Sequence, residues 1–104
     1  MTSPLHSLEG LSVTNVVQLH GYIQLRFGDE IGMSIYNDVS VTPSAIRIDG
    51  LVGKMVISIT EQEDCINIRF LDGSQLRIEM RQEAYKGPEA IELHRKGFPP
   101  VIWN

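Results

Sequence analysis

The segment from Cys65 to Met80 constrains the fold more than any other part of this chain. Apolar side chains recur at every second position on both sides of Asp72-Gly73. A period of two gives a β-strand one apolar and one polar face, and two such runs around a short turn with glycine are typical of a hairpin. The pattern therefore predicts an antiparallel β-hairpin that buries one face.

The length of the turn decides which side chains face one another across this hairpin. A two-residue loop of Asp72-Gly73 would set polar side chains opposite apolar ones. A three-residue loop, Leu71–Gly73, sets Ile68 opposite Leu76 and keeps each face of one kind. It also places Gly73 at the left-handed position of the turn, where glycine has no steric penalty. We predict the three-residue loop.

A second copy of the same pattern lies earlier in the chain. A shift of 43 residues aligns residues 8–37 with residues 51–80, and eight of the 30 aligned positions are identical. The identical pairs are Leu8/Leu51, Gly10/Gly53, Val13/Val56, Ile23/Ile66, Arg26/Arg69, Phe27/Phe70, Asp29/Asp72 and Ile35/Ile78. The alignment indicates an internal repeat of two three-stranded meanders, 8–50 and 51–80, followed by C-terminal strands. We predict an all-β fold, a small sandwich or barrel, in one domain spanning residues 1–104.

Some segments are less regular than the hairpin. Residues 28–30 correspond to its turn, but Glu30 replaces the favourable glycine and predicts a more strained or differently shaped turn. The valines near the start of the first copy do not alternate, which predicts a bulge or a strand buried on both faces. The other predictions are β-prone runs at Val39–Val41 and Ala45–Ile48, a loop or helical turn at Arg81–Gly87, a strand at Ala90–His94, and an apolar edge strand behind Pro99-Pro100.

The composition excludes several classes of protein. With 42% hydrophobic and 21% charged residues the chain resembles folded globular proteins, and no apolar run approaches the roughly 18 residues of a membrane helix. The first residues lack the basic and apolar regions of a signal peptide, and the single cysteine, Cys65, fits a reducing cytoplasm. A net charge of −4 argues against nucleic acid and for a basic partner. We expect a cytoplasmic protein that does not bind membranes.

Two pairs of duplicated charged residues are candidates for a binding or catalytic site. Arg26 and Arg69 occupy equivalent positions on the polar faces of the middle strands, where they either contact an anion or lie on a solvated sheet face. Asp29 and Asp72 could serve as acid/base groups or metal ligands, but both lie in turns, where aspartate is favoured for its hydrogen bonds to the backbone. We favour the solvated face and the turn.

Catalytic motifs are missing from the sequence. His6, His20 and His94 have no metal-ligand spacing, and no phosphate-binding glycine loop or nucleophile elbow is present. We therefore predict no catalytic residue, no metal and no cofactor.

The C-terminal tail holds the other candidate binding residues. Tyr85 and Glu89 lie in a segment that is not duplicated, and Phe98 and Trp103 are aromatic residues of the kind enriched at binding hot spots. The alternative is that Phe98 and Trp103 close one end of the core. A terminal apolar edge strand also favours pairing with a second copy of the chain, so a homodimer is predicted.

Two stretches together carry a resemblance to known proteins. These are Ile-Arg-Phe-Leu-Asp-Gly-Ser-Gln-Leu-Arg-Ile-Glu at 68–79, and Tyr-Lys-Gly-Pro-Glu-Ala at 85–90 followed by Val-Ile-Trp at 101–103. They resemble a loosely defined group of short bacterial β-proteins of unknown function, some of which look like immunity proteins encoded beside secreted toxins. The resemblance implies a non-enzymatic protein-binding module, of the kind that inhibits a partner. The alternatives are a small-molecule or anion-binding β-barrel and a structural homo-oligomer.

Overall fold

The computed structural model describes residues 3–104, and these form an all-β fold as predicted. Nine strands and three short 3₁₀ helices make up the described chain, and none of these helices is long and apolar enough to cross a membrane. The strands are β1 (Asn15–Leu19), β2 (Tyr22–Arg26), β3 (Ile31–Ile35), β4 (Val39–Thr42), β5 (Val56–Glu61), β6 (Cys65–Phe70), β7 (Gln75–Glu79), β8 (Ile91–Arg95) and β9 (Val101–Trp103). The 3₁₀ helices are η1 (Pro4–Leu8), η2 (Ile48–Leu51) and η3 (Gln82–Ala84).

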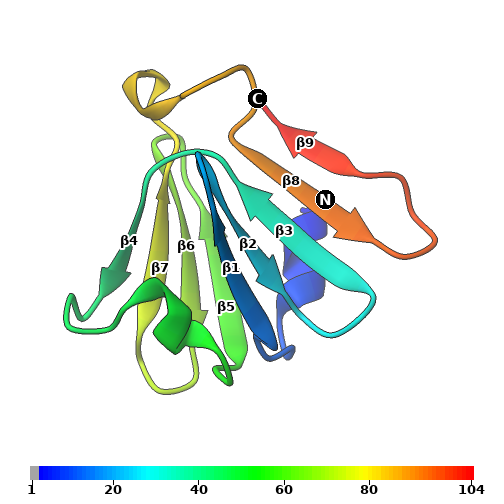
Figure 1. The fold of residues 1–104 in the computed structure, drawn as a ribbon, viewed down its shortest axis with the longest axis vertical. Coiled ribbons are helices and arrows are strands. Elements are labelled where there is room, and N and C mark those ends of the chain that lie inside the picture. The colour runs from blue at the N-terminus through cyan, green and yellow to red at the C-terminus, as the bar shows by residue number, and fades with distance from the viewer. Residues whose placement is uncertain (1–2) are drawn as a thin grey trace.

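The strands form two antiparallel sheets around a shared apolar core (Figure 1). The five-stranded sheet has the order β1-β2-β3-β8-β9, and the four-stranded sheet has the order β4-β7-β6-β5. The three strands predicted for each copy stay within one sheet, β1–β3 in the first and β5–β7 in the second. The strand that follows each meander crosses to the other sheet, since β4 pairs with β7 and β8 pairs with β3. The chain is therefore closer to a sandwich than to a closed barrel.

The two halves also meet where the sheets come together, at residues 10–13 and 53–56. The amide of Gly10 donates to the carbonyl of Val56, and the amide of Gly53 donates to the carbonyl of Val13, both at 2.7 Å. Under the 43-residue shift Gly10 corresponds to Gly53 and Val13 corresponds to Val56. The two hydrogen bonds are therefore equivalent, with donor and acceptor exchanged between the halves. The contact between the halves thus joins residues that the sequence alignment makes equivalent. A common origin of the halves by duplication stays a prediction.

The predicted hairpin is confirmed in its register. Ile68 faces Leu76 across β6 and β7, and the Phe70 amide bonds to the Ser74 carbonyl at 2.9 Å, which leaves a three-residue loop. Gly73 has φ +89°, the left-handed conformation expected at that position.

The first hairpin has the predicted register and, as expected, a turn of different shape. Leu25 faces Met33, and the Phe27 amide bonds to the Ile31 carbonyl at 2.9 Å. The left-handed residue is Gly28, at φ +86°, and no other residue type in the described chain has a positive φ. The glycine stands at the first loop position because Glu30 cannot adopt this conformation without strain.

Two local predictions need correction. Residues 45–48 do not form a strand; the chain there is irregular and then enters η2, whose Leu51 is buried in the core. Within residues 3–104, no strand pairs with this segment. The bulge lies not in β1, which begins only at Asn15, but in β5, between Val56 and Ser58. The strand at 91–95, the short helical turn at 82–84 and the edge strand at 101–103 agree with prediction.

The core is built from the inward-facing side chains of both sheets. Its members include Leu25 and Met33 from the first sheet and Ile68 and Leu76 from the second. The buried leucines of η1 and η2 close the space between the sheets; these are Leu5, Leu8 and Leu51. One continuous core therefore holds the two sheets face to face.

The left-handed turn residue supplies the first prediction. Gly73→Ala should lower the free energy of unfolding by about 1–2 kcal/mol, because a Cβ is sterically disfavoured at this φ. Gly87→Ala is the matched control, since its Cβ would meet nothing within 4 Å and its φ is not left-handed. Urea unfolding of the three proteins measures both effects. Equal stability of the two variants would contradict the assigned turn.

Candidate functional site

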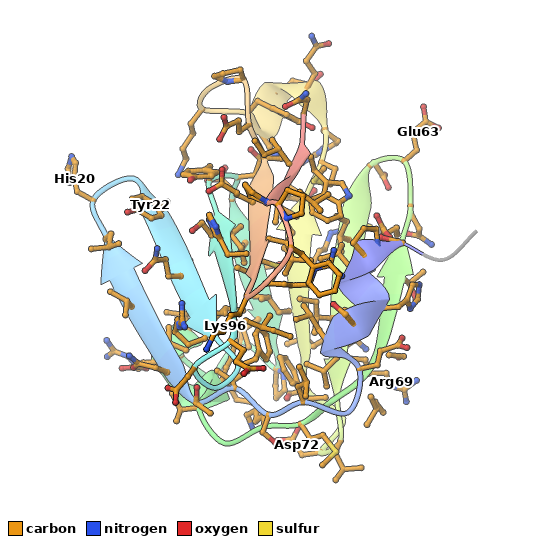
Figure 2. The ribbon with its side chains drawn as sticks, turned by 90° about the vertical axis from the view of Figure 1, so that its right-hand side faces the viewer. His20, Tyr22, Glu63, Arg69, Asp72 and Lys96 are labelled. Atoms are coloured by element: carbon orange, nitrogen blue, oxygen red, sulfur yellow. The ribbon has the colours of Figure 1, made fainter. Side chains whose placement is uncertain are left out.

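Carboxylates gather where the β5–β6 loop lies beside η3. A surface pocket of about 730 Å³ is lined there by residues 62–64 and 80–83, and its carboxylates come from Glu63, Asp64 and Glu83. The Met80 amide bonds to the Asp64 carbonyl at 2.9 Å and holds the two segments together. Figure 2 shows Glu63 pointing away from the sheets at this end of the molecule. We call this site the acidic pocket.

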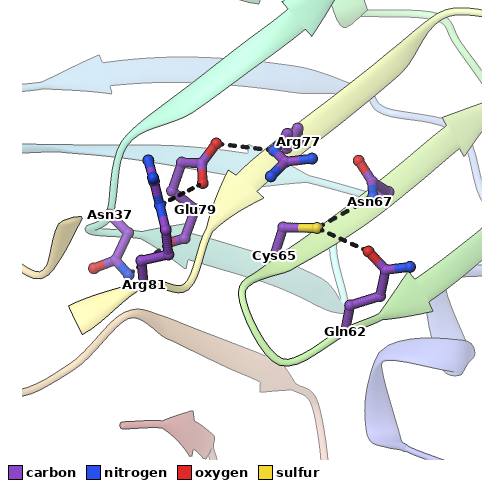
Figure 3. Close-up of polar contacts among 7 residues, drawn as sticks. All are labelled: Asn37, Gln62, Cys65, Asn67, Arg77, Glu79 and Arg81. Carbon is purple, nitrogen blue, oxygen red and sulfur yellow. Dashed lines mark hydrogen bonds and ion pairs between the residues drawn. The ribbon is translucent and has the colours of Figure 1, made fainter. Parts of the chain in front are cut away.

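The three carboxylates of the acidic pocket outnumber its one arginine. Arg81 lines it, but its Nε lies 3.5 Å from Glu79 Oε2, and Figure 3 shows this ion pair. Among the ion pairs of residues 3–104, none includes Glu63, Asp64 or Glu83. Three carboxylates therefore remain free to attract a cation.

A second pocket, of about 470 Å³, adjoins the acidic pocket and shares Met80 and Gln82 with it. Its other walls are Tyr85, Gly87, Pro88 and the terminal Asn104. The Tyr85 amide bonds to the Gln82 carbonyl at 3.2 Å, so η3 fixes the start of this wall, and the Tyr85 ring packs partly against the core. A recess with polar side chains and an aromatic wall thus lies beside free carboxylates. Glu89 lies further along, in a separate recess with Tyr36 and Lys86.

The two candidate aromatic residues of the tail, Phe98 and Trp103, do not lie together. Trp103 faces Ile91 at the start of β8, packs partly against the core, and donates from its indole Nε1 to Glu61 Oε1 at 3.2 Å. Phe98 follows Arg95 at the other end of β8, and 61% of its surface is exposed. The register of the β8–β9 hairpin separates the two rings. Trp103 therefore helps to close the core, and Phe98 does not.

The duplicated arginines lie on different sheets and in different surroundings. Arg26 on β2 donates from Nη2 to the carbonyls of Gly28 at 3.4 Å and Asp29 at 3.1 Å. Its side chain crosses Gly32, where a Cβ would lie 2.8 Å from Nη1. Arg69 on β6 is exposed, and Figure 2 shows its side chain directed outward. The structure does not bring the two guanidinium groups together.

An aromatic pair on the outer face of the five-stranded sheet was missed by the sequence reasoning. The rings of Tyr22 and Tyr36 are 5.2 Å apart and tilted by 36°. Burial and the nearby charge of Glu92 raise the pKa of the Tyr36 hydroxyl above its ordinary value. A three-residue turn at residues 28–30 already places these tyrosines opposite each other, so the pair was within reach of the sequence.

The single cysteine is enclosed by its neighbours. Cys65 is buried and faces Glu79 across the hairpin, as predicted. Its thiol donates to Gln62 Oε1 at 3.2 Å and lies 3.5 Å from the Asn67 amide nitrogen, as Figure 3 shows. In the part of the chain that the structure describes, no three His, Cys, Asp or Glu side chains are arranged to hold a metal ion.

The duplicated aspartates also differ. Asp72 Oδ1 accepts hydrogen bonds from the Ser74 amide at 2.9 Å and hydroxyl at 2.6 Å, and Asp72 pairs with Lys54. The Lys54 contact first, and then the Ser74 bonds, hold the pKa of the Asp72 carboxyl well below its usual range. The side chain of Asp29 has no ion pair within residues 3–104. Asp72 is therefore a turn residue that links two strand ends.

In comparisons with known proteins, no family model, curated protein or solved structure matched the chain. Function is therefore inferred from the residues and geometry of this molecule alone.

The lowered pKa of Asp72 predicts how stability depends on pH. The ionised carboxylate stabilises the fold fully above its ordinary pKa, about 4, and this contribution is lost as the pH falls through that value toward the lower pKa of the folded state. Asp72→Asn should therefore be less stable than the parent at pH 7, and the difference should narrow at pH 3. Urea unfolding at both pH values measures it.

Asp29→Asn is the matched control, because it removes the equivalent carboxylate where no ion pair exists. The difference in unfolding free energy between Asp29→Asn and the parent should change much less between pH 7 and pH 3. If the difference in unfolding free energy between Asp72→Asn and the parent were the same at pH 7 and pH 3, the proposed role of the Asp72 charge would be contradicted.

Proposed function

We propose that this chain is a non-enzymatic protein-binding module, of the immunity type, that binds a basic surface of a partner protein. The observation that carries the proposal is the acidic pocket, whose free carboxylates lie directly beside a recess that combines polar side chains with an aromatic wall. Charge complementarity of this kind speeds association and selects the partner, and buried apolar contacts then hold the complex. The net charge of −4 is consistent with it.

The two pockets suit different parts of one partner. Glu63, Asp64 and Glu83 would pair with lysine or arginine side chains, while Met80 and Tyr85 would contact an apolar side chain of the same segment. Tyrosine contributes large contact area with few rotatable bonds, which limits the entropy lost on binding. The proposal also includes two expectations from the sequence, which are the resemblance to short bacterial immunity-like proteins and a cytoplasmic location.

A homodimer is a second candidate, and one observation favours it. Strand β9 is an edge of the five-stranded sheet, and Ile102 on it is 42% exposed. An edge strand presents unpaired backbone groups that a second copy of the chain can pair with. Light scattering of the purified protein at two concentrations tests this arrangement, and a monomer at both would contradict it.

Charge reversal at the acidic pocket tests the main proposal. Partners are first captured by cross-linking in the source cells, and each purified candidate is then titrated by calorimetry. Glu63→Lys and Glu83→Lys should each raise the Kd of the true partner at least tenfold, because each turns an attraction into a repulsion. Affinity and association rate should also fall as salt rises.

Asp49→Lys is the control, since it changes the net charge equally but lies in η2, outside both pockets. It should leave the Kd unchanged within twofold. Binding that is insensitive to both pocket variants, or equally sensitive to all three, would contradict the proposal.

A further inference from the structure

A separate cavity lies at the end of β8, away from the acidic pocket. The β2–β3 turn and the turn after β8 lie side by side there, joined by a hydrogen bond of 2.8 Å from the Lys96 amide to the Glu30 carbonyl. The cavity between them has a volume of about 250 Å³. Its lining includes Arg26, Gly32, His94, Arg95, Lys96 and Phe98. Figure 2 shows Lys96 in this region.

The cations of this cavity outnumber its carboxylates. Arg26, Arg95 and Lys96 line it together with Asp29 and Glu30. Within the described residues, no ion pair includes any of these five side chains. The three cations are therefore not neutralised by neighbouring carboxylates, although two carboxylates are close at hand.

Arg26 is held in place before any ligand arrives. The carbonyls of Gly28 and Asp29 accept hydrogen bonds from its Nη2, which leaves Nη1 and Nε without a protein partner among the described residues. Gly32 gives the guanidinium room to lie across β3. At the equivalent position of the second half stands Gln75, and Arg69 there is exposed. The glycine is therefore what distinguishes the arginine in the cavity from its counterpart.

Arg95 supplies a second oriented guanidinium. Its Nε is buried and has no hydrogen-bond partner within residues 3–104, and its central carbon lies 4.7 Å from the centre of the Phe98 ring. The stacked ring fixes the guanidinium and offers an apolar wall.

We propose that this cavity binds the phosphate group of a small molecule. Two guanidinium groups and one ammonium provide donors to several oxygens of one tetrahedral anion, which suits phosphate better than a single carboxylate. Phe98 would contact whatever the phosphate is attached to. The site is independent of the acidic pocket, because the two share no lining residue.

Inorganic phosphate is the first probe, titrated into ¹⁵N-labelled full-length protein and followed by NMR. The Gly32 and Lys96 amide signals should shift and saturate with a single Kd. Arg26→Gln and Lys96→Gln should each raise that Kd at least tenfold, whereas Arg69→Gln, the equivalent arginine outside the cavity, should leave it unchanged. Lys96 is exposed in a turn, so its variant tests the site even where Arg26→Gln perturbs folding.

Gly32→Ala tests position rather than charge. Its Cβ would displace the Arg26 guanidinium, so phosphate binding should weaken at least fivefold with the net charge unaltered. Gly87→Ala, where a Cβ meets nothing, should have no effect. Shifts that do not saturate, or equal weakening by Arg69→Gln and Arg26→Gln, would overturn the proposal by showing diffuse electrostatic attraction only.

Phenyl phosphate is the second probe, and it distinguishes two sources of the anion. Tighter binding than inorganic phosphate, abolished by Phe98→Ala, supports a site for an aromatic phosphate ester. Equal binding of the two probes supports a site for the free ion. Both outcomes require the losses in Arg26→Gln and Lys96→Gln, without which the proposal fails.

Discussion

The structure depends on an exchange of strands between the two meanders. Strand β4 leaves the first meander to pair with β7, and β8 leaves the second to pair with β3. Neither sheet is complete without the other half of the chain. Hydrogen bonds between residues 10–13 and 53–56, and one of 2.8 Å from the Asn37 side chain to the Glu79 carbonyl, reinforce the exchange. Separating the two halves of the chain would therefore break backbone pairing in both sheets, in addition to exposing the core.

The same exchange creates both candidate sites. The chain reaches β8 from β7 through residues 80–90, and this crossing segment supplies one wall of the acidic pocket and most of the recess beside it. Where β8 ends beside β3, its turn brings Arg95 and Lys96 to the turn of the first hairpin. The recess beside the acidic pocket consequently lies near the start of β8, and the second site lies at the end of that strand. Each joins residues that are more than 15 positions apart in sequence.

The alternation of apolar and polar side chains determines how much of the fold and of the sites can be predicted from the sequence. Alternating side chains fix which face of a strand is buried, and the turn length fixes the register, so the pairing of Ile68 with Leu76 was predictable. Alternation does not say which strand lies beside which when they are far apart in the chain. The meeting of Arg26 with Lys96 depends on β8 joining β3 and was therefore not predictable. The separation of Phe98 from Trp103 follows instead from the register of the β8–β9 hairpin. The prediction of a β-strand at residues 45–48 was wrong for a related reason, because β-prone side chains form a strand only beside a partner strand.

The two halves show how equivalent positions come to serve different purposes. In the second half Lys54 pairs with Asp72, so the turn is locked by charge and Arg69 is left on an exposed sheet face. In the first half Leu11 stands at the position of Lys54, and the Arg26 guanidinium binds the turn carbonyls instead. A glycine at 32 rather than a glutamine is what permits this, since a Cβ there would occupy the space of the guanidinium. The residues that differ around a shared arginine therefore determine where a binding site can form.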